Sequence, residues 1–178
     1  MTDAQDSSAD LHAPIPDHLP KAVGFLLSQL GFEVAGRFTK LMAEVQLEPR
    51  QFAVMRAIQA AQGMSQNQVG EWLRIPPSSM VSVIDQLESR RLVERRAHPT
   101  DRRARLLHIT AQGTETLDRA TVLAMGLEQT ICEGFAPEVR MELIRLLDRV
   151  TENLGLVQGL HPGMPSSAHT HEGTGSPH

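Results

Sequence analysis

The chain has 178 residues and a formal net charge of −4 at pH 7, which predicts one compact domain with appended tails. It contains a single cysteine, Cys132, so an internal disulfide framework is excluded and a reducing, cytoplasmic location is expected. No stretch reaches the roughly 18 consecutive apolar residues that a membrane helix needs, and the acidic N-terminus has no basic-then-apolar export pattern.

The positive charge of the chain is concentrated in one segment. Between residues 74 and 105, eight arginines stand against four acidic residues, so this segment carries +4 and the rest of the chain −8. A negative total taken alone argues against binding to nucleic acid. Clustering matters more than the total, however, and a basic segment inside an acidic protein predicts a surface that faces a polyanion.

The N-terminal part of the chain predicts a disordered segment followed by a long helix. Residues 1–16 are polar and contain two prolines. From residue 17 to 46 the apolar residues recur at helical spacing on one face, whereas Phe25 and Phe32 lie on the other. A helix that is apolar on both sides is normally buried on both sides. It therefore serves as a central core helix or as a dimerisation helix, and a ligand crevice beside the two phenylalanines is compatible with either role.

Three shorter helices are expected next. Pro49 begins the first of them, Ser65 caps a second that runs to Leu73, and after a break the third covers residues 78–90. Two short helices joined by a tight turn are typical of a helix-turn-helix, whose second helix enters the major groove of DNA. An ordinary helical hairpin with a solvated end is the alternative.

The most cationic part of the chain is predicted to be a β-hairpin. Two β-capable segments, 92–96 and 105–109, flank a polar loop that contains Pro99, Asp101 and Arg103. Arginines crowded onto a short two-stranded ribbon repel one another. Such a ribbon is therefore expected where a phosphate backbone or a carboxylate supplies compensating charge.

Two further helices are expected after the hairpin. Thr110 caps one that reaches about Cys132, and Pro137 begins another that ends near Val157. Their apolar faces have no partner left once the preceding helices form a core. We therefore expect residues 110–157 to pack against the first helix and against the same helices of a second copy, giving a two-fold dimer. Residues 158–178 are rich in Pro, Gly, Ser and His and predict a disordered tail.

With these elements in this order, the sequence resembles the MarR (multiple antibiotic resistance regulator) family of winged-helix transcription factors. The resemblance covers about residues 20–155, and its motifs are Leu92-Val93-x-Arg95, Pro99-x-Asp101-x-Arg103, Leu107-x-Ile109-Thr110-x-x-Gly113 and, more loosely, Leu47-x-Pro49-x-Gln51-Phe52. It implies a mainly α fold with a small β-hairpin wing. A winged helix-turn-helix lobe at residues 47–109 would then lie between N- and C-terminal dimerisation helices.

The resemblance also implies a function. Family members are homodimers that bind a pseudo-palindromic operator, usually as repressors, and are released by a small phenolic or aromatic ligand or by oxidation. By resemblance, Arg103 reaches into the minor groove of double-stranded DNA and Asp101 orients nearby arginines. The base contacts of the second helix of the helix-turn-helix would map to Pro77, Ser78, Ser79, Val81 and Ser82.

The chain departs from the family pattern at two places. Val81-Ser82 stands where relatives often have a Thr-Arg pair, so base readout is expected to depend more on small side chains and on groove shape. Arg74 stands where many relatives have glycine, which adds a candidate phosphate contact. Arg102 and Arg105 are further phosphate candidates.

The physical chemistry of guanidinium supports these assignments independently, since its planar donors suit both a narrow, negative minor groove and phosphate. Arg103 could also have a structural role beside Asp101, and the two roles are not exclusive. The remaining arginines of the segment are expected more often to be solvated or ion-paired than to contact DNA: Arg90, Arg91, Arg95 and Arg96.

An aromatic or phenolic effector is expected between the first helix and the DNA-binding lobe, near Phe25, Phe32 and Phe52. The alternatives are a dimer that binds such a ligand without binding DNA, and a regulator that senses oxidation through Cys132. The sensing cysteines of the family lie near the N-terminal helix, so a core or interface thiol is the preferred interpretation of Cys132. The histidines of the tail are interpreted as solvated rather than as a weak metal site.

Enzymatic activity is the rival class of function. The sequence has no Gly-rich phosphate loop, no G-x-S-x-G elbow, no H-E-x-x-H motif and no Cys-x-x-Cys pair. We therefore expect no catalytic residues, no cofactor and no resident metal.

Overall fold

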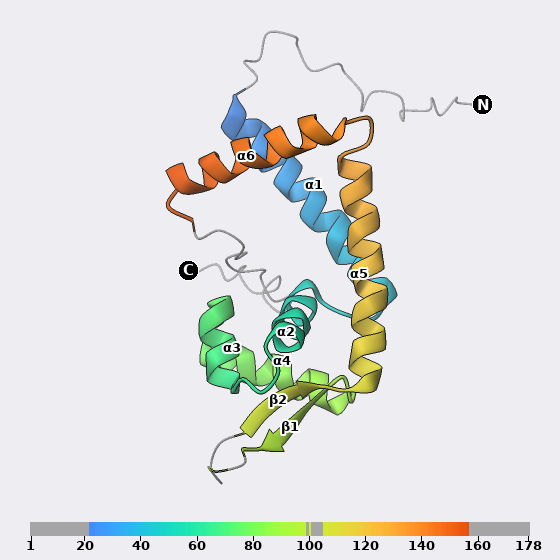
Figure 1. The fold of residues 1–178 in the computed structure, drawn as a ribbon, viewed down its shortest axis with the longest axis vertical. Coiled ribbons are helices and arrows are strands. Elements are labelled where there is room, and N and C mark those ends of the chain that lie inside the picture. The colour runs from blue at the N-terminus through green and yellow to red at the C-terminus, as the bar shows by residue number, and fades with distance from the viewer. Residues whose placement is uncertain (1–21, 99, 101–104, 157–178) are drawn as a thin grey trace, which may run out of the picture. The chain divides into compact units, whose positions relative to one another are not determined.

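The computed structural model describes residues 22–98, 100 and 105–156. In chain order (Figure 1) the elements are α1 (Val23–Glu44), α2 (Pro49–Ala60), α3 (Gln66–Leu73), α4 (Pro77–Ser89), β1 (Val93–Ala97), β2 (Arg105–Ile109), α5 (Ala111–Ile131) and α6 (Pro137–Asn153). This is the predicted mainly helical fold with a two-stranded wing. Residues up to Ala35 and residues from Gly36 onward form separate units, so the first half of α1 is described by itself.

The predicted elements are all present, with shifted ends. Among the described residues the first helix runs from Val23 to Glu44, and its predicted start at residue 17 lies outside them. The last helix ends at Asn153 rather than near Val157. The first strand is displaced by one residue, because the amide of Leu92 donates to the carbonyl of Leu87 at 2.9 Å and so closes the end of α4. The expected disordered segments, 1–16 and 158–178, lie outside the described residues.

Side-chain caps fix where three of the helices begin. The Ser65 hydroxyl accepts from the amide of Gln68 at 3.3 Å, and the Gln68 side chain accepts from the amide of Ser65 at 2.8 Å. Before α5, the Thr110 hydroxyl accepts from the amide of Gly113 at 2.9 Å. At α2 the Gln51 side chain accepts from the amide of Glu48 at 3.0 Å. Each cap satisfies amides that have no partner inside the helix, as the sequence predicted for Ser65 and Thr110.

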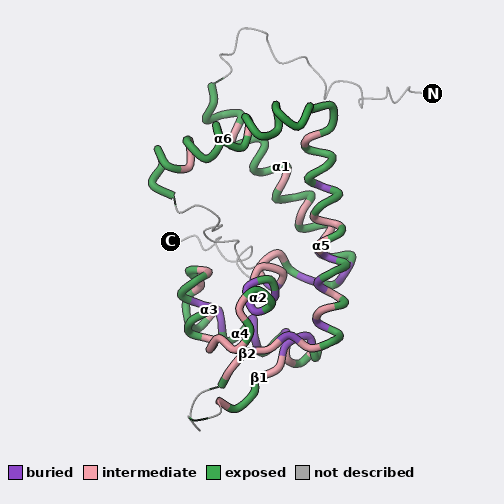
Figure 2. The backbone as a smooth tube through the Cα atoms, viewed as in Figure 1, coloured by how far each residue is buried: buried purple, intermediate pink, exposed green. Residues whose placement is uncertain are grey.

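The hydrophobic core lies beneath α2, α3, α4, the two strands and the first half of α5 (Figure 2). Four apolar residues on one side of α4 are buried: Met80, Val83, Ile84 and Leu87. From α1 only Met42 is buried, and Phe25 and Phe32 are 63% and 85% exposed. The described part of the first unit, residues 22–35, contains no buried residue.

The later helices leave most of their apolar side chains uncovered. No residue of α6 is buried in the chain, although its sequence has a strong apolar stripe. None of the described helices combines the length and apolar character that crossing a membrane would require.

The wing is attached to the rest of the lobe through its backbone. Strands β1 and β2 are antiparallel, with Val93 opposite Ile109 and Ala97 opposite Arg105. On its other edge β2 bonds the segment before α3, since Leu107 donates to the Met64 carbonyl at 2.8 Å and accepts from the Gly63 amide at 3.1 Å. The direction in which the wing leaves the lobe is therefore set by hydrogen bonds on both edges of β2.

Gly113 lets α5 pack directly against the base of the wing. A Cβ atom at this position would lie 2.0 Å from the carbonyl oxygen of Leu92 and 2.8 Å from Cγ1 of Ile109. Only a residue without a side chain fits this contact. The glycine in the motif Ile109-Thr110-x-x-Gly113 is thus a packing requirement.

Candidate nucleic-acid interface

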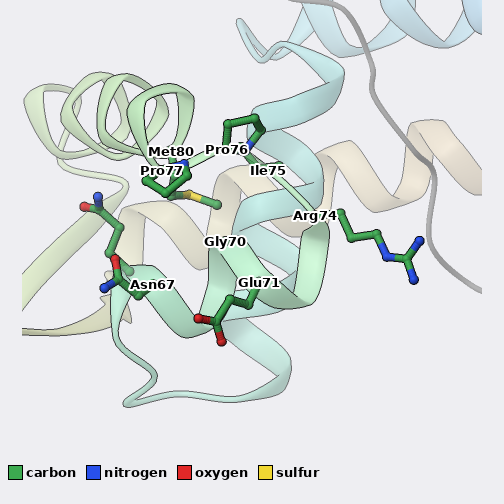
Figure 3. A pocket seen from close by; sticks show the side chains of 9 residues that line it. Asn67, Gly70, Glu71, Arg74, Ile75, Pro76, Pro77 and Met80 are labelled. Atoms are coloured by element: carbon green, nitrogen blue, oxygen red, sulfur yellow. The ribbon is translucent and has the colours of Figure 1, made fainter.

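Helices α3 and α4 are joined by a turn that begins with Arg74. This residue ends α3 with φ 52° and ψ 36°, in the left-handed region, which costs a non-glycine residue roughly 1–2 kcal/mol. Its side chain is exposed and extends away from Asn67 and Glu71 (Figure 3). A strained backbone thus holds an exposed cation at the turn, as the predicted phosphate contact requires.

The outer face of α4 presents most of the predicted base contacts. Pro77, Ser78, Val81 and Ser82 are exposed, and Ser79 is half-buried at the edge of this face. The opposite side of the helix is held in the core. The accessible face is therefore well defined. Neither this face nor the rest of α4 contains a lysine or an arginine.

A hollow of about 430 Å³ lies beside the turn, between α3 and the start of α4 (Figure 3). It is lined by Gln66, Asn67, Gly70, Glu71, Arg74, Ile75, Pro76, Pro77 and Met80. At Gly70 an added Cβ would lie 3.3 Å from the Ile75 carbonyl. The small residue thus allows the turn to approach α3 closely.

Arg95 on β1 joins the wing to both helices. Its guanidinium donates to Asp85 Oδ1 at 2.6 Å, to Gln66 Oε1 at 3.1 Å and to the carboxylate of Glu88. Partial burial by itself lowers the pKa of Arg95, but hydrogen bonds and charge attraction from Asp85 and Glu88 outweigh burial and raise its pKa. Arg95 was expected to be ion-paired. Its bridging of α3, α4 and β1 was not predicted.

Three other arginines of the basic segment serve local structure. Arg96 pairs with Glu94 at 2.5 Å. Arg90 donates to the backbone carbonyl of Gln46, just beyond the end of α1. The backbone of Arg91 has φ 56°, and its carbonyl accepts from the Thr110 hydroxyl at 2.6 Å.

The loop at the end of the wing lies outside the described residues. It contains Asp101, Arg102 and Arg103, so the roles expected of these three residues stay predictions. Arg105 is described: it is exposed at the first position of β2.

A partly buried hydrogen bond ties α2 to α4. Gln51 is 5% exposed, and its Nε2 donates to Gln86 Oε1 at 2.9 Å. Because the same side chain also accepts from the amide of Glu48, both ends of the Gln51 amide are satisfied. Together with Arg95, this bond fixes α4 relative to its neighbours, and the sequence analysis missed both.

The residues predicted to contact a ligand differ in their surroundings. Phe52 is half-buried and packs edge-on against Phe38, with ring centroids 5.6 Å apart, whereas Phe25 and Phe32 are exposed.

A second hollow, of about 490 Å³, lies between the end of α1 and α5. Its lining residues are Arg37, Lys40, Leu41, Val122, Leu123, Gly126, Leu127 and Thr130. The three phenylalanines predicted to contact a ligand are not among these residues.

In the described part of the chain, no group of three or more His, Cys, Asp or Glu side chains is arranged to hold a metal ion. Cys132 is half-buried at the end of α5, where its thiol lies 3.7 Å from Glu128 Oε1.

Comparison with known proteins finds similar sequences for the central part of the chain and for most of its length. A family model described as the MarR family matches residues 45–104. A protein described as a transcriptional regulator for the hcr operon of Thauera aromatica is 27% identical over 145 residues, which are 81% of this chain and 87% of the relative.

Solved structures extend the similarity. The structure of the transcriptional repressor CouR bound to a 23-mer DNA duplex is 30% identical with a TM-score of 0.67, covering 79% of this chain and 99% of that one. CouR from Rhodococcus jostii RHA1 bound to p-coumaroyl-CoA is 30% identical with a TM-score of 0.61, covering 73% of this chain and 92% of that one. Apo MarR from E. coli, at 19% identity with a TM-score of 0.62, covers 72% and 96% and shares the fold.

Proposed function

Because this chain belongs to the MarR family of DNA-binding transcriptional regulators, we propose that it is a repressor that binds a pseudo-palindromic operator as a homodimer and is released by a small aromatic or phenolic ligand. The family consists of regulators rather than enzymes. The observation that carries the proposal is the exposed outer face of α4, held beside the wing by Arg95. Such a regulator works in the cytoplasm, on the nucleoid.

In the proposed complex α4 lies in the major groove, which is about 12 Å wide and admits one helix. Base edges would be met by the outer-face residues Pro77, Ser78, Ser79, Val81 and Ser82. Arg103 would enter the minor groove with Asp101 orienting it, and phosphates would be met by Arg74, Arg102 and Arg105. The local charge of +4 supports this arrangement, since backbone contacts dominate affinity for DNA.

The proposed homodimer would use residues 17–46 and 110–157. The supporting observation is the apolar surface that the later helices leave exposed in one chain: Val122, Met125, Ile131, Phe135, Val139, Met141, Ile144, Leu146, Leu147, Leu154 and Leu156. Monomeric proteins rarely expose so many large apolar side chains on consecutive helices. A second copy related by two-fold symmetry would cover them.

The proposal of an aromatic effector is supported by the ligand of a similar protein. CouR, at 30% identity, has been captured with p-coumaroyl-CoA, a ligand with an aromatic acyl group. In this chain Phe25, Phe32 and Phe52 are the proposed aromatic contacts for a similar group. The test is a thermal-shift screen of phenolic and aromatic acids and their thioesters, followed by measuring whether a stabilising compound releases bound DNA. If no such compound stabilises the protein or releases DNA, the effector part of the proposal fails.

The DNA-binding part is tested by gel shift with a duplex from the promoter upstream of the gene. We expect Arg103→Ala to weaken binding. Because a guanidinium in the minor groove also neutralises phosphate charge, the variant should reduce the slope of log K against log salt by up to about 0.9. Arg56→Ala, which removes an exposed arginine of α2 outside the proposed dimer and DNA contacts, is the matched control. Equal affinity and slope in wild type and Arg103→Ala would remove the wing from the proposal.

The symmetry of the complex is tested separately. A two-fold dimer presents its two α4 helices about 34–36 Å apart, so the half-sites should lie one helical turn apart. Footprinting is expected to show two such half-sites. A single unsymmetrical half-site would contradict the homodimer.

A further inference from the structure

The outer face of α4 lacks the side chains that most often read guanine and adenine. Specific readout in the major groove commonly uses Arg or Lys for guanine and Asn or Gln for adenine. The sequence of α4, PSSMVSVIDQLES, has no Arg, Lys or Asn. Its single glutamine, Gln86, is exposed, but its Oε1 accepts the hydrogen bond from buried Gln51 at 2.9 Å, so this oxygen is already engaged within the protein.

The exposed face offers apolar surface instead. Val81 is 44% exposed, between the exposed Ser78 and Ser82, and Pro77 is exposed one turn earlier. Valine is stiff at χ1 in a helix, so its two methyl groups are held in a fixed direction. The one apolar group that a base pair presents in the major groove is the C5-methyl of thymine.

The acidic residue on the same face is neutralised within the protein. Asp85 follows Val81 by one turn, and its carboxylate accepts from Arg95 at 2.6 Å. The pair offsets the charge of a carboxylate that would otherwise face the phosphates, and it engages Oδ1 of Asp85. Apolar contact is therefore the strongest sequence-reading interaction that this face offers.

We infer that α4 reads thymine methyl groups, with Val81 as the principal contact and Pro77 as the second. Residues four apart on a helix are separated by about 6 Å along its axis, which is close to two base steps of about 3.4 Å. Each half-site should thus carry thymines about two steps apart where α4 enters the groove. The inference rests on the proposed function, because it requires α4 to lie in the major groove.

The experiment uses the full chain and begins by selecting duplexes from a randomised pool. Each thymine of the selected half-site is then replaced by deoxyuridine, which removes only the C5-methyl group. We expect the thymine that faces Val81 to be sensitive, with about a fourfold loss of affinity per methyl removed, or about 15-fold when both half-sites are substituted. Replacing thymines outside the α4 contact by deoxyuridine should leave the affinity unchanged.

The variant Val81→Ala tests whether the Val81 side chain causes the loss of affinity on uracil substitution. Val81 is exposed, so the variant should keep its thermal stability. It should bind the thymine duplex about as weakly as wild type binds the uracil duplex, and the two losses should not add. Ser82→Ala is the control, in which sensitivity to uracil is expected to persist.

The outcomes separate the inference from the function on which it rests. If selection enriches no duplex, the proposed DNA-binding mode itself fails. If a duplex is selected but uracil is tolerated at every thymine, or if Val81→Ala remains as sensitive to uracil as wild type, α4 does not read methyl groups through Val81.

Discussion

Gly113→Ala is expected to destabilise the protein even though alanine is the better helix former. The new Cβ would lie 2.0 Å from the Leu92 carbonyl oxygen, and ordinary contact begins at 3.4 Å, so the two must separate by roughly 1.4 Å. The Leu92 carbonyl cannot retreat freely, because it accepts from the amide of Thr110 at 3.1 Å. Overpacking of this kind costs up to about 3 kcal/mol.

The higher helix propensity of alanine offsets about 1 kcal/mol of that cost, which leaves a net loss of about 2 kcal/mol and lowers Tm by about 4–8 °C. Gly126→Ala is the matched control in the same helix, since a Cβ there would meet nothing within 4 Å in the chain. It should stabilise the protein by about 1 kcal/mol. Thermal and urea unfolding followed by circular dichroism, at one protein concentration, measures both.

The substitution should also affect DNA binding, because Gly113 packs against the base of the wing and the added Cβ would shift the wing relative to α5. Gly113→Ala should weaken binding in a gel shift performed well below its Tm, and Gly126→Ala should not. The reasoning is refuted if the two variants change stability in the same direction, or if Gly113→Ala leaves both stability and DNA affinity unchanged.

Three further substitutions test single contacts. Arg95→Met should weaken DNA binding, because it leaves the Asp85 carboxylate unpaired beside the phosphates. The slope of log K against log salt should stay unchanged, since no phosphate contact is removed. Adding Asp85→Asn to the same chain should recover part of the lost affinity, and no recovery would contradict the pairing role. Arg74→Gly should change the unfolding free energy by less than about 1 kcal/mol, because relief of the left-handed backbone opposes the greater freedom of glycine in the unfolded chain. The slope of log K against log salt for DNA binding should fall. An unchanged slope would exclude the phosphate contact. Gln51→Leu should cost about 1 kcal/mol in urea unfolding, because it removes the hydrogen bonds to Gln86 Oε1 and to the amide of Glu48, and wild-type stability would show that these bonds are unimportant.

The elements of the lobe were predictable because their signals are local. Caps such as Ser65 and Thr110, prolines at first turns and apolar periodicity all act within a few residues, and the observed helices begin where those signals lie. The start of β1 was misplaced by one residue. That position depends on whether Leu92 bonds to the strand or to the end of α4, which composition does not reveal.

The contacts that fix the interface were not predictable in the same way. Arg95 meets Asp85 and Gln66 across separations of 10 and 29 residues, and Gln51 meets Gln86 across 35. Side-chain pairing over such distances follows from the packed fold and leaves no periodic pattern in the sequence. The sequence therefore indicated which face of α4 is exposed, whereas the structure was needed to find what holds that face in place.

The hydrogen bond from Arg90 to the carbonyl of Gln46 links the last turn of α4 to the end of α1. Gln46 has φ 57°, so the chain turns sharply at the point where this bond is made. Met42 and Val45 near the same end belong to the hydrophobic core, so the end of α1 is connected to the lobe by packing and by this guanidinium. A displacement of the end of α1 is therefore expected to reach α4 through both connections.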